Sequence, residues 1–202
     1  NDWAYYLLSQ ICVIISFLFV WELSKNFFKN KIYSLLSLLI LEGIVFFNYT
    51  TPEFNVYICQ LPLKAALVYF FWRGINTNEL INWVLVGFIS SLGILTHYSF
   101  IFILLSLLVY FIFFLKKNKK TFQLFLVSFL IFLLILIPHF IWLFENNFET
   151  IKYALSRTDI EKKSMVTHFI NPFIFILKQV GMIILFLFAF FSIISFKKID
   201  KI

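Results

Sequence analysis

The chain has 202 residues, of which 62% are hydrophobic and 13% are charged. A soluble domain has about 45–50% apolar and about 25% charged residues, so this composition excludes an ordinary soluble globular protein and predicts an integral membrane protein. The formal net charge of +7 arises from short basic clusters beside apolar runs, which is typical of membrane topology and argues against nucleic acid as a partner.

Seven apolar runs follow one another along the chain, and each approaches the roughly 20 residues that a helix needs to cross a bilayer. All should be helices, because only a helix satisfies its own backbone hydrogen bonds in lipid. The fold class is therefore expected to be an all-α, polytopic transmembrane bundle. The expected spans are Tyr6–Leu23, Ile32–Tyr49, Phe54–Trp72, Leu80–Thr96, Tyr98–Leu115, Phe122–Phe144 and Phe169–Phe196.

The joint between the fourth and fifth spans is the polar sequence Thr96-His97-Tyr98. A break at this joint gives two short spans, and the alternative is one long buried helix from Leu80 to Leu115. Lys and Arg concentrate in alternate loops, which places the N-terminus outside and the C-terminus inside. The chain begins with Asn1 rather than Met, so we expect residues 1–202 to form a single transmembrane domain that is a fragment of a longer protein.

Two charged residues fall inside expected spans. Glu42 lies in the second span and Lys64 lies near the middle of the third. A charge at this depth costs about 2.5–3.5 kcal/mol, so such residues are candidates for function. Because the two spans form an antiparallel hairpin, Glu42 and Lys64 are predicted to form an ion pair; the alternative is that each lies in a separate polar pocket or reaches the interface.

The turn between these spans contains Pro52 and Glu53. Proline favours the first turn of a helix, and a carboxylate is stabilised by the dipole at a helix N-terminus, so both residues have a structural explanation. An external carboxylate at this position is also suited to bind a sugar hydroxyl, a metal or an amine. The loop from Glu145 to His168 is likewise either a solvated linker or a binding segment for a phosphate or sugar head group.

Several short stretches are informative through their order and spacing. Together they resemble bacterial members of the dolichyl-phosphate-mannose–protein mannosyltransferase family, also called glycosyltransferase family 39, within the GT-C superfamily. The stretches are Thr51-Pro52-Glu53-Phe54-Asn55, Leu61-Pro62-Leu63, Phe71-Trp72-Arg73, Trp83 to Gly87, Leu92 to Ser99, Pro138 to Leu143, Asn147-Phe148, Tyr153 to Arg157, and His168 with Pro172 and Gln179.

The resemblance implies a multi-pass enzyme of the bacterial inner membrane. Such an enzyme moves a sugar from a polyprenyl-phosphate donor to a lipid, glycan or protein acceptor on the external face. The family's catalytic acid lies in the first external loop, which this chain is expected to lack, so no catalytic residue is assigned. No metal ligand is assigned either, and the resemblance leaves open whether the full-length enzyme uses a divalent metal.

The resemblance also implies which residues bind substrate. Glu53 occupies the place of a second external acid that orients a sugar or helps a metal, and Asn55 and Tyr98 stand in the matched motifs. His97 replaces the lysine that often meets the donor phosphate, and an imidazole can still donate a hydrogen bond. Arg157 is the better candidate for the phosphate, because its guanidinium fork suits phosphate oxygens.

Two other function classes compete with the transferase. A multi-pass transporter or lipid flippase would use the intramembrane charges to line a path, but the internal repeat that many transporters show is not visible. A non-catalytic membrane subunit, or a polysaccharide polymerase or ligase, is the second rival. Sequence upstream of Asn1 discriminates them, since an acidic external loop after one more apolar span favours the transferase.

Overall fold

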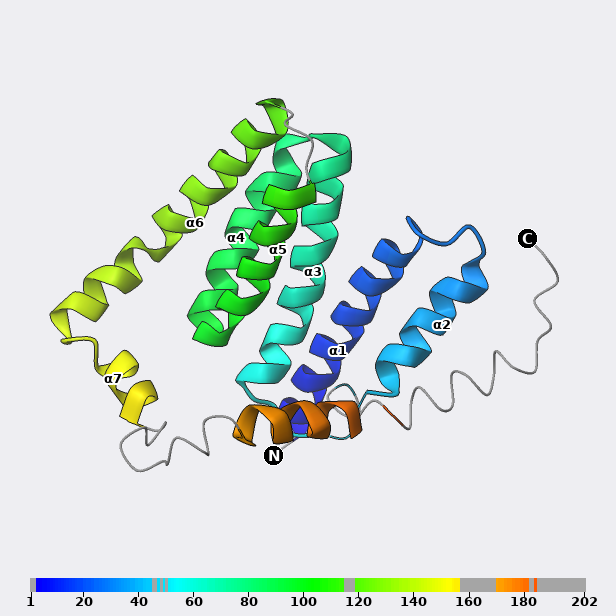
Figure 1. The fold of residues 1–202 in the computed structure, drawn as a ribbon, viewed down its shortest axis with the longest axis horizontal. Coiled ribbons are helices and arrows are strands. Elements are labelled where there is room, and N and C mark those ends of the chain that lie inside the picture. Colours follow the sequence, from blue (N-terminus) through cyan, green and yellow to red (C-terminus); the bar gives the residue numbers. More distant parts are fainter. Residues whose placement is uncertain are drawn as a thin grey trace.

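The computed structural model describes residues 3–44, 47, 49, 51–114, 119–156, 170–181 and 184. Every regular element in these ranges is helical, so the predicted all-α class is confirmed for the described part of the chain. A further helix covers residues 170–181 and follows the others (Figure 1). The elements before it are α1 (Trp3–Ser24), α2 (Lys31–Glu42), α3 (Val56–Thr77), α4 (Leu80–Thr96), η2 (Tyr98–Phe100), α5 (Ile101–Phe114), α6 (Lys119–Glu145) and α7 (Glu149–Ser156).

An aromatic core holds the centre of the bundle together. Helix α3 packs against both α1 and α4, and α4 packs against α6. Trp83 of α4 is fully buried and makes edge contacts with the rings of Phe71 and Phe111 at centroid distances of 5.8 and 5.9 Å. Its indole N–H donates to the carbonyl oxygen of Gly74 at 3.1 Å, so the one polar atom of this large side chain is satisfied.

Helices α4 and α6 approach each other at a glycine. A Cβ added to Gly87 would lie 2.4 Å from the backbone oxygen of Ser128, so only glycine permits this approach. Ser91, one turn further along α4, donates to the carbonyl oxygen of Gly87 at 2.8 Å and contacts that of Phe132 at 3.3 Å. Close approach at small residues is the usual way in which helices pack within a membrane.

Two expected helix boundaries are wrong. Helix α2 ends at Glu42 with Gly43 as its cap, although the apolar sequence continues to Tyr49. Helix α3 begins at Val56, because the Asn55 side chain accepts hydrogen bonds from the backbone N–H groups of Tyr57 and Ile58. Pro52 and Glu53 therefore lie in the turn before the helix and not in its first turn.

The predicted break after the fourth span is confirmed. Helix α4 ends at Thr96, and His97 has an extended backbone with φ −167° and ψ 134°. The ring of Phe100, in η2, fills the space beside Gly93, where a Cβ would lie 2.3 Å from the ring. The single helix from Leu80 to Leu115 is thereby excluded, and the chain turns at the polar joint.

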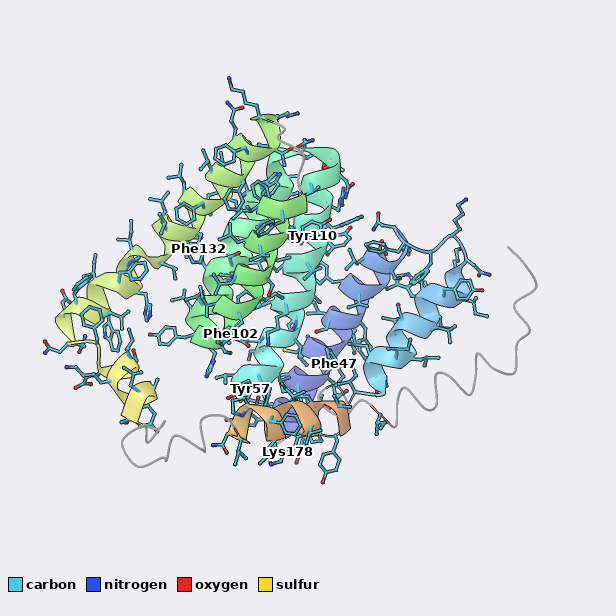
Figure 2. All side chains as sticks on the ribbon, in the orientation of Figure 1. Phe47, Tyr57, Phe102, Tyr110, Phe132 and Lys178 are labelled. Carbon is cyan, nitrogen blue, oxygen red and sulfur yellow. The ribbon has the colours of Figure 1, made fainter. Side chains whose placement is uncertain are left out.

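The outer surface of the bundle is apolar. Phe102 and Phe113 of α5 are 71% and 77% exposed, and Figure 2 labels Phe102 near the start of α5. By length and composition, α1 and α6 are able to cross a membrane, and α4 and the η2–α5 segment are shorter apolar helices. Most of the expected seventh span, Phe169–Phe196, lies outside the described residues.

Candidate functional site

The residues singled out in the sequence gather at one end of the bundle. The start of α3, the end of α4 and the start of α5 meet there because successive packed helices run in opposite directions (Figure 1). This geometry brings Glu53, Asn55, His97 and Tyr98 to the same end. Arg157, the fifth predicted binding residue, lies outside the described residues.

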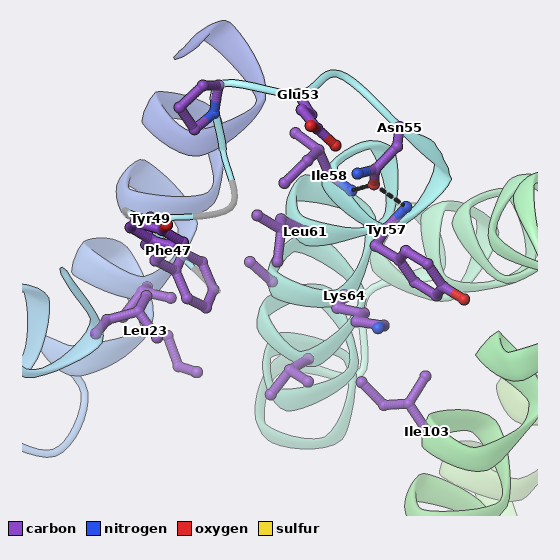
Figure 3. Close-up of a pocket in the computed structure, with 15 residues that line it drawn as sticks. Leu23, Phe47, Tyr49, Glu53, Asn55, Tyr57, Ile58, Leu61, Lys64 and Ile103 are labelled. Atoms are coloured by element: carbon purple, nitrogen blue, oxygen red, sulfur yellow. Dashed lines mark hydrogen bonds between the residues drawn. The ribbon is translucent and has the colours of Figure 1, made fainter. Parts of the chain in front are cut away.

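A large cavity opens beside the start of α3. Its volume is about 1060 Å³, and its walls come from α1, α2, the 47–55 turn, α3 and Ile103 of α5. Most of the lining is aliphatic or aromatic, while Glu53, Asn55 and Lys64 supply polar groups. Figure 3 shows Glu53 and Asn55 at one end of the cavity, with Leu61 and Lys64 further along α3. An apolar cavity with a few convergent polar groups is the usual form of a ligand site.

Glu53 and Asn55 differ in how free they are to bind. Glu53 is exposed in the turn before α3. The Oδ1 atom of Asn55 accepts from Tyr57 N at 2.9 Å and from Ile58 N at 3.2 Å, which fixes the side chain as a helix cap. Its Nδ2 group remains as a donor beside the carboxylate, so the pair offers one acceptor and one donor to a hydroxylated ligand.

The predicted ion pair between Glu42 and Lys64 is wrong. Lys64 is half-buried in the wall of the cavity and forms no hydrogen bond or ion pair with any other described residue. Glu42 is the last residue of α2, and the cavity is lined by its neighbour Leu41. The early end of α2 moves Glu42 out of the mid-span position on which the prediction depended.

His97 lies in a smaller hollow of about 460 Å³, which it lines together with Tyr98, His139, Trp142 and Thr150, among others. The Nδ1 atom of His97 accepts from Ser99 N at 3.1 Å and contacts Ser99 Oγ at 2.8 Å. With Nδ1 occupied as an acceptor, Nε2 is the ring nitrogen that is left to donate a hydrogen bond to a ligand.

Tyr98 joins three elements. Its hydroxyl lies 2.9 Å from His139 Nε2 in α6 and 3.0 Å from Thr150 Oγ1 in α7. The turn after α6 makes the second contact possible, because Asn147 and Phe148 both have positive φ values, 51° and 58°, and reverse the chain. Tyr98 thus connects η2 to α6 and α7 through one hydroxyl group. Thr150 was not singled out in the sequence analysis, because the loop from Glu145 to His168 was interpreted only as a whole, either as a solvated linker or as a binding segment for a head group.

The cavity and the hollow adjoin. The rings of Tyr57, which lines the cavity, and His97, which lines the hollow, have centroids 5.4 Å apart. Gln60, buried in α3, donates from Nε2 to the carbonyl oxygen of His97 at 3.1 Å. The two spaces therefore share a wall made by one turn of α3 and the polar joint after α4.

Among the described residues, no three His, Cys, Asp or Glu side chains come close enough together to hold an ion. The polar groups present are suited to hydrogen bonding and to charge pairing with a ligand.

Comparison with known proteins gives one family match. The family model described as dolichyl-phosphate-mannose-protein mannosyltransferase matches residues 1–142. This range includes α1 to α5, all the residues that line the cavity, and His139. No curated protein and no solved structure matches significantly. The match covers more than half of the chain and agrees with the helical, apolar architecture. The chain therefore belongs to the dolichyl-phosphate-mannose–protein mannosyltransferase family of membrane glycosyltransferases, whose donor is a lipid-linked sugar.

Proposed function

We propose that the protein transfers a sugar from a polyprenyl-phosphate donor to a lipid, glycan or protein acceptor at the external face of a bacterial inner membrane. The supporting observation is the cavity beside α3, which combines a long apolar lining with Glu53 and Asn55 at one end. A lipid-linked sugar likewise has a polar end, the sugar, and a long apolar part, the lipid chain, so its polarity matches that of the cavity. We place α1 and α6 across the bilayer with five further spans, the N-terminus outside and the C-terminus inside.

In this proposal the polar end of the cavity recognises the sugar. The Glu53 carboxylate accepts hydrogen bonds from sugar hydroxyls, and Asn55 Nδ2 donates one. His97 donates through Nε2 across the shared wall, and Tyr98 holds the neighbouring helices in place. None of these residues is the catalytic base, which the family resemblance puts in the first external loop. The contact of Arg157 with the lipid phosphate stays a prediction.

Transfer activity of the full-length protein in membranes tests the proposal. Polyprenyl-phosphate sugars are supplied as donors, and wild type is compared with Glu53→Gln and with Glu145→Gln. Glu145 is a matched control, because it is an exposed carboxylate at the end of α6 that does not line the cavity. We expect roughly a 10-fold to 100-fold loss of transfer for Glu53→Gln, as for loss of a hydrogen bond to a charged group, and little change for Glu145→Gln.

The proposal fails if wild type consumes no polyprenyl-phosphate sugar. It also loses its structural basis if Glu53→Gln and Glu145→Gln behave alike at equal expression. Release of free polyprenyl phosphate must accompany transfer, whereas a flippase would move the intact donor without breaking the glycosidic bond.

A further inference from the structure

Lys64 is a positive charge without a described partner inside the apolar wall of the cavity. It lies eight residues after Val56, the first residue of α3, which is about 12 Å along the helix at 1.5 Å per residue. A four-carbon stem does not span that distance, so the ammonium group does not simply reach the end of the helix. Figure 3 shows the side chain extending from α3 on the side of Ile103.

The charges along the cavity are arranged in order. Glu53 and Asn55 stand at the end where α3 begins, and Lys64 lies further in. Beyond it the lining is apolar, with Val68 one turn further along α3, and Val20 and Leu23 in the last turns of α1. A ligand that matches this order has hydroxyl groups first, an anion next and a hydrocarbon chain last.

Two other described groups are less suited to hold that anion. His97 lines the separate smaller hollow, where its Nδ1 atom already accepts from Ser99 N, and Glu53 repels a negative charge at the outer end. Lys64 is the one cation among the described residues that line the cavity. The volume of about 1060 Å³ lies just above the range of about 300–1,000 Å³ for ligand pockets, so it accommodates a head group together with part of a chain.

We propose that this cavity binds the lipid phosphate of the donor, with the Lys64 ammonium group donating hydrogen bonds to the phosphate oxygens. The assignment rests on the proposed function and adds to it a phosphate ligand within α3, besides the predicted contact of Arg157. The sugar then points to Glu53 and Asn55, and the polyprenyl chain runs along α1 and the inner part of α3. Lys64 Nζ, with three donors, is suited to a phosphate approached from several directions.

A comparison of the affinities for a lipid phosphate and for the corresponding alcohol distinguishes a phosphate-binding site from general lipid binding. The full-length protein is placed in phosphatidylcholine nanodiscs, and its affinities for decaprenyl monophosphate and for decaprenol are measured. We expect wild type to prefer the phosphate roughly 10-fold or more, the range of a charge-assisted hydrogen bond. Lys64→Met should remove the preference while leaving decaprenol binding intact, and Lys64→Arg should keep most of it.

Lys31→Met is the matched control, because Lys31 is exposed at the start of α2 and does not line the cavity. It should keep the wild-type preference. The assignment is overturned if Lys64→Met keeps the preference, or if Lys31→Met loses it equally. It is also overturned if Lys64→Met loses decaprenol binding together with thermal stability, because that combination shows a structural role.

Two competitors define the source of the phosphate. Phosphatidic acid and inorganic phosphate are each added at the concentration of decaprenyl monophosphate. We expect neither to displace it, and equal displacement by either would replace the donor assignment with a general phosphate site. If wild type binds decaprenyl phosphate through Lys64 but transfers no sugar, the proposed function fails and the lipid-phosphate site stands. If sugar is transferred with the same donor KM in Lys64→Met, the site fails and the transferase stands.

Discussion

The two faces of α3 differ in packing. On one face, Leu67 and Phe71 are buried against Trp83 of α4 in an aromatic core with close helix contacts. On the adjacent side, towards the start of the helix, Lys64 and Ala65 line a cavity of about 1060 Å³, whose other walls come from α1, α2 and Ile103 of α5. Neighbouring residues of one helix thus serve different purposes. The close-packed side stabilises the bundle, and the side with Lys64 is where we propose that the donor binds.

The largest effect is expected where the core is tightest. Gly87→Ala places a Cβ 2.4 Å from Ser128 O, a contact with backbone that α4 and α6 can relieve only by moving apart. Overpacking of this kind costs about 1–3 kcal/mol, and a backbone clash belongs at the upper end. Thermal unfolding in detergent measures the loss. Gly181→Ala is the control, since nothing lies within 4 Å of its added Cβ, and equal losses at both glycines would contradict the close approach.

Trp83→Phe tests the centre of the same core. The change shortens a fully buried side chain and removes the indole donor from the Gly74 carbonyl, which still accepts from Asn78 N at 3.0 Å. The lost hydrogen bond costs about 0.5–1.5 kcal/mol, and the space left beside the smaller ring adds to that loss. We expect a lower unfolding midpoint with no change in affinity for a lipid phosphate at temperatures where the protein stays folded. A midpoint equal to wild type would show that the indole contact does not stabilise the bundle.

Ala65 and Ala66 compare the two faces directly. Ala66 is 5% exposed and belongs to the core, whereas Ala65 lines the cavity. Ala66→Leu should cost about 1–3 kcal/mol by overpacking. Ala65→Leu should leave the unfolding midpoint near that of wild type, because its side chain has space, and should weaken donor binding by filling that space. The same pattern from both variants would show that the two faces are not different.

The smallest effect concerns Tyr98. Tyr98→Phe removes the hydroxyl that contacts His139 and Thr150, and one such hydrogen bond contributes about 0.5–1.5 kcal/mol. We expect α7 to open more readily, and faster amide hydrogen exchange in residues 149–156 measures this. Exchange in α3 should stay as in wild type. Unchanged exchange in α7 would mean that Thr150 is held there by other contacts.

The sequence predicted helices well where polar residues interrupt the apolar pattern. The bounds Leu80–Thr96 agree with α4 because Glu79 and His97 mark its ends. The end of α2 was missed, since the apolar run continues past Gly43. The eight-residue helix α7 was also missed. The turn before it has positive φ values at Asn147 and Phe148, and without a glycine there the sequence carries no turn signal that marks the start of a new helix.

The candidate site was predictable only in outline. Alternation of helix direction places Glu53 and His97 at one end, so their grouping follows from the order of the spans. The contacts of Tyr98 join residues 41 and 52 positions apart, and no local pattern encodes them. Lys64 was recognised as costly in lipid, but its partner was inferred from depth along straight helices. The early end of α2 removed that partner and left the charge facing the cavity.

Photo-crosslinking with a polyprenyl phosphate analogue tests the central claim most directly. The probe carries a photoreactive group on its first isoprene unit, next to the phosphate, and labelled peptides of the full-length protein are mapped with and without excess decaprenyl monophosphate. If the cavity is the donor site, the label should lie on α1 and α3, and the competitor should remove it. The label should be reduced in Lys64→Met but not in Lys31→Met. Label confined to the outer faces of α5 and α6, or label that the competitor leaves in place, would contradict it.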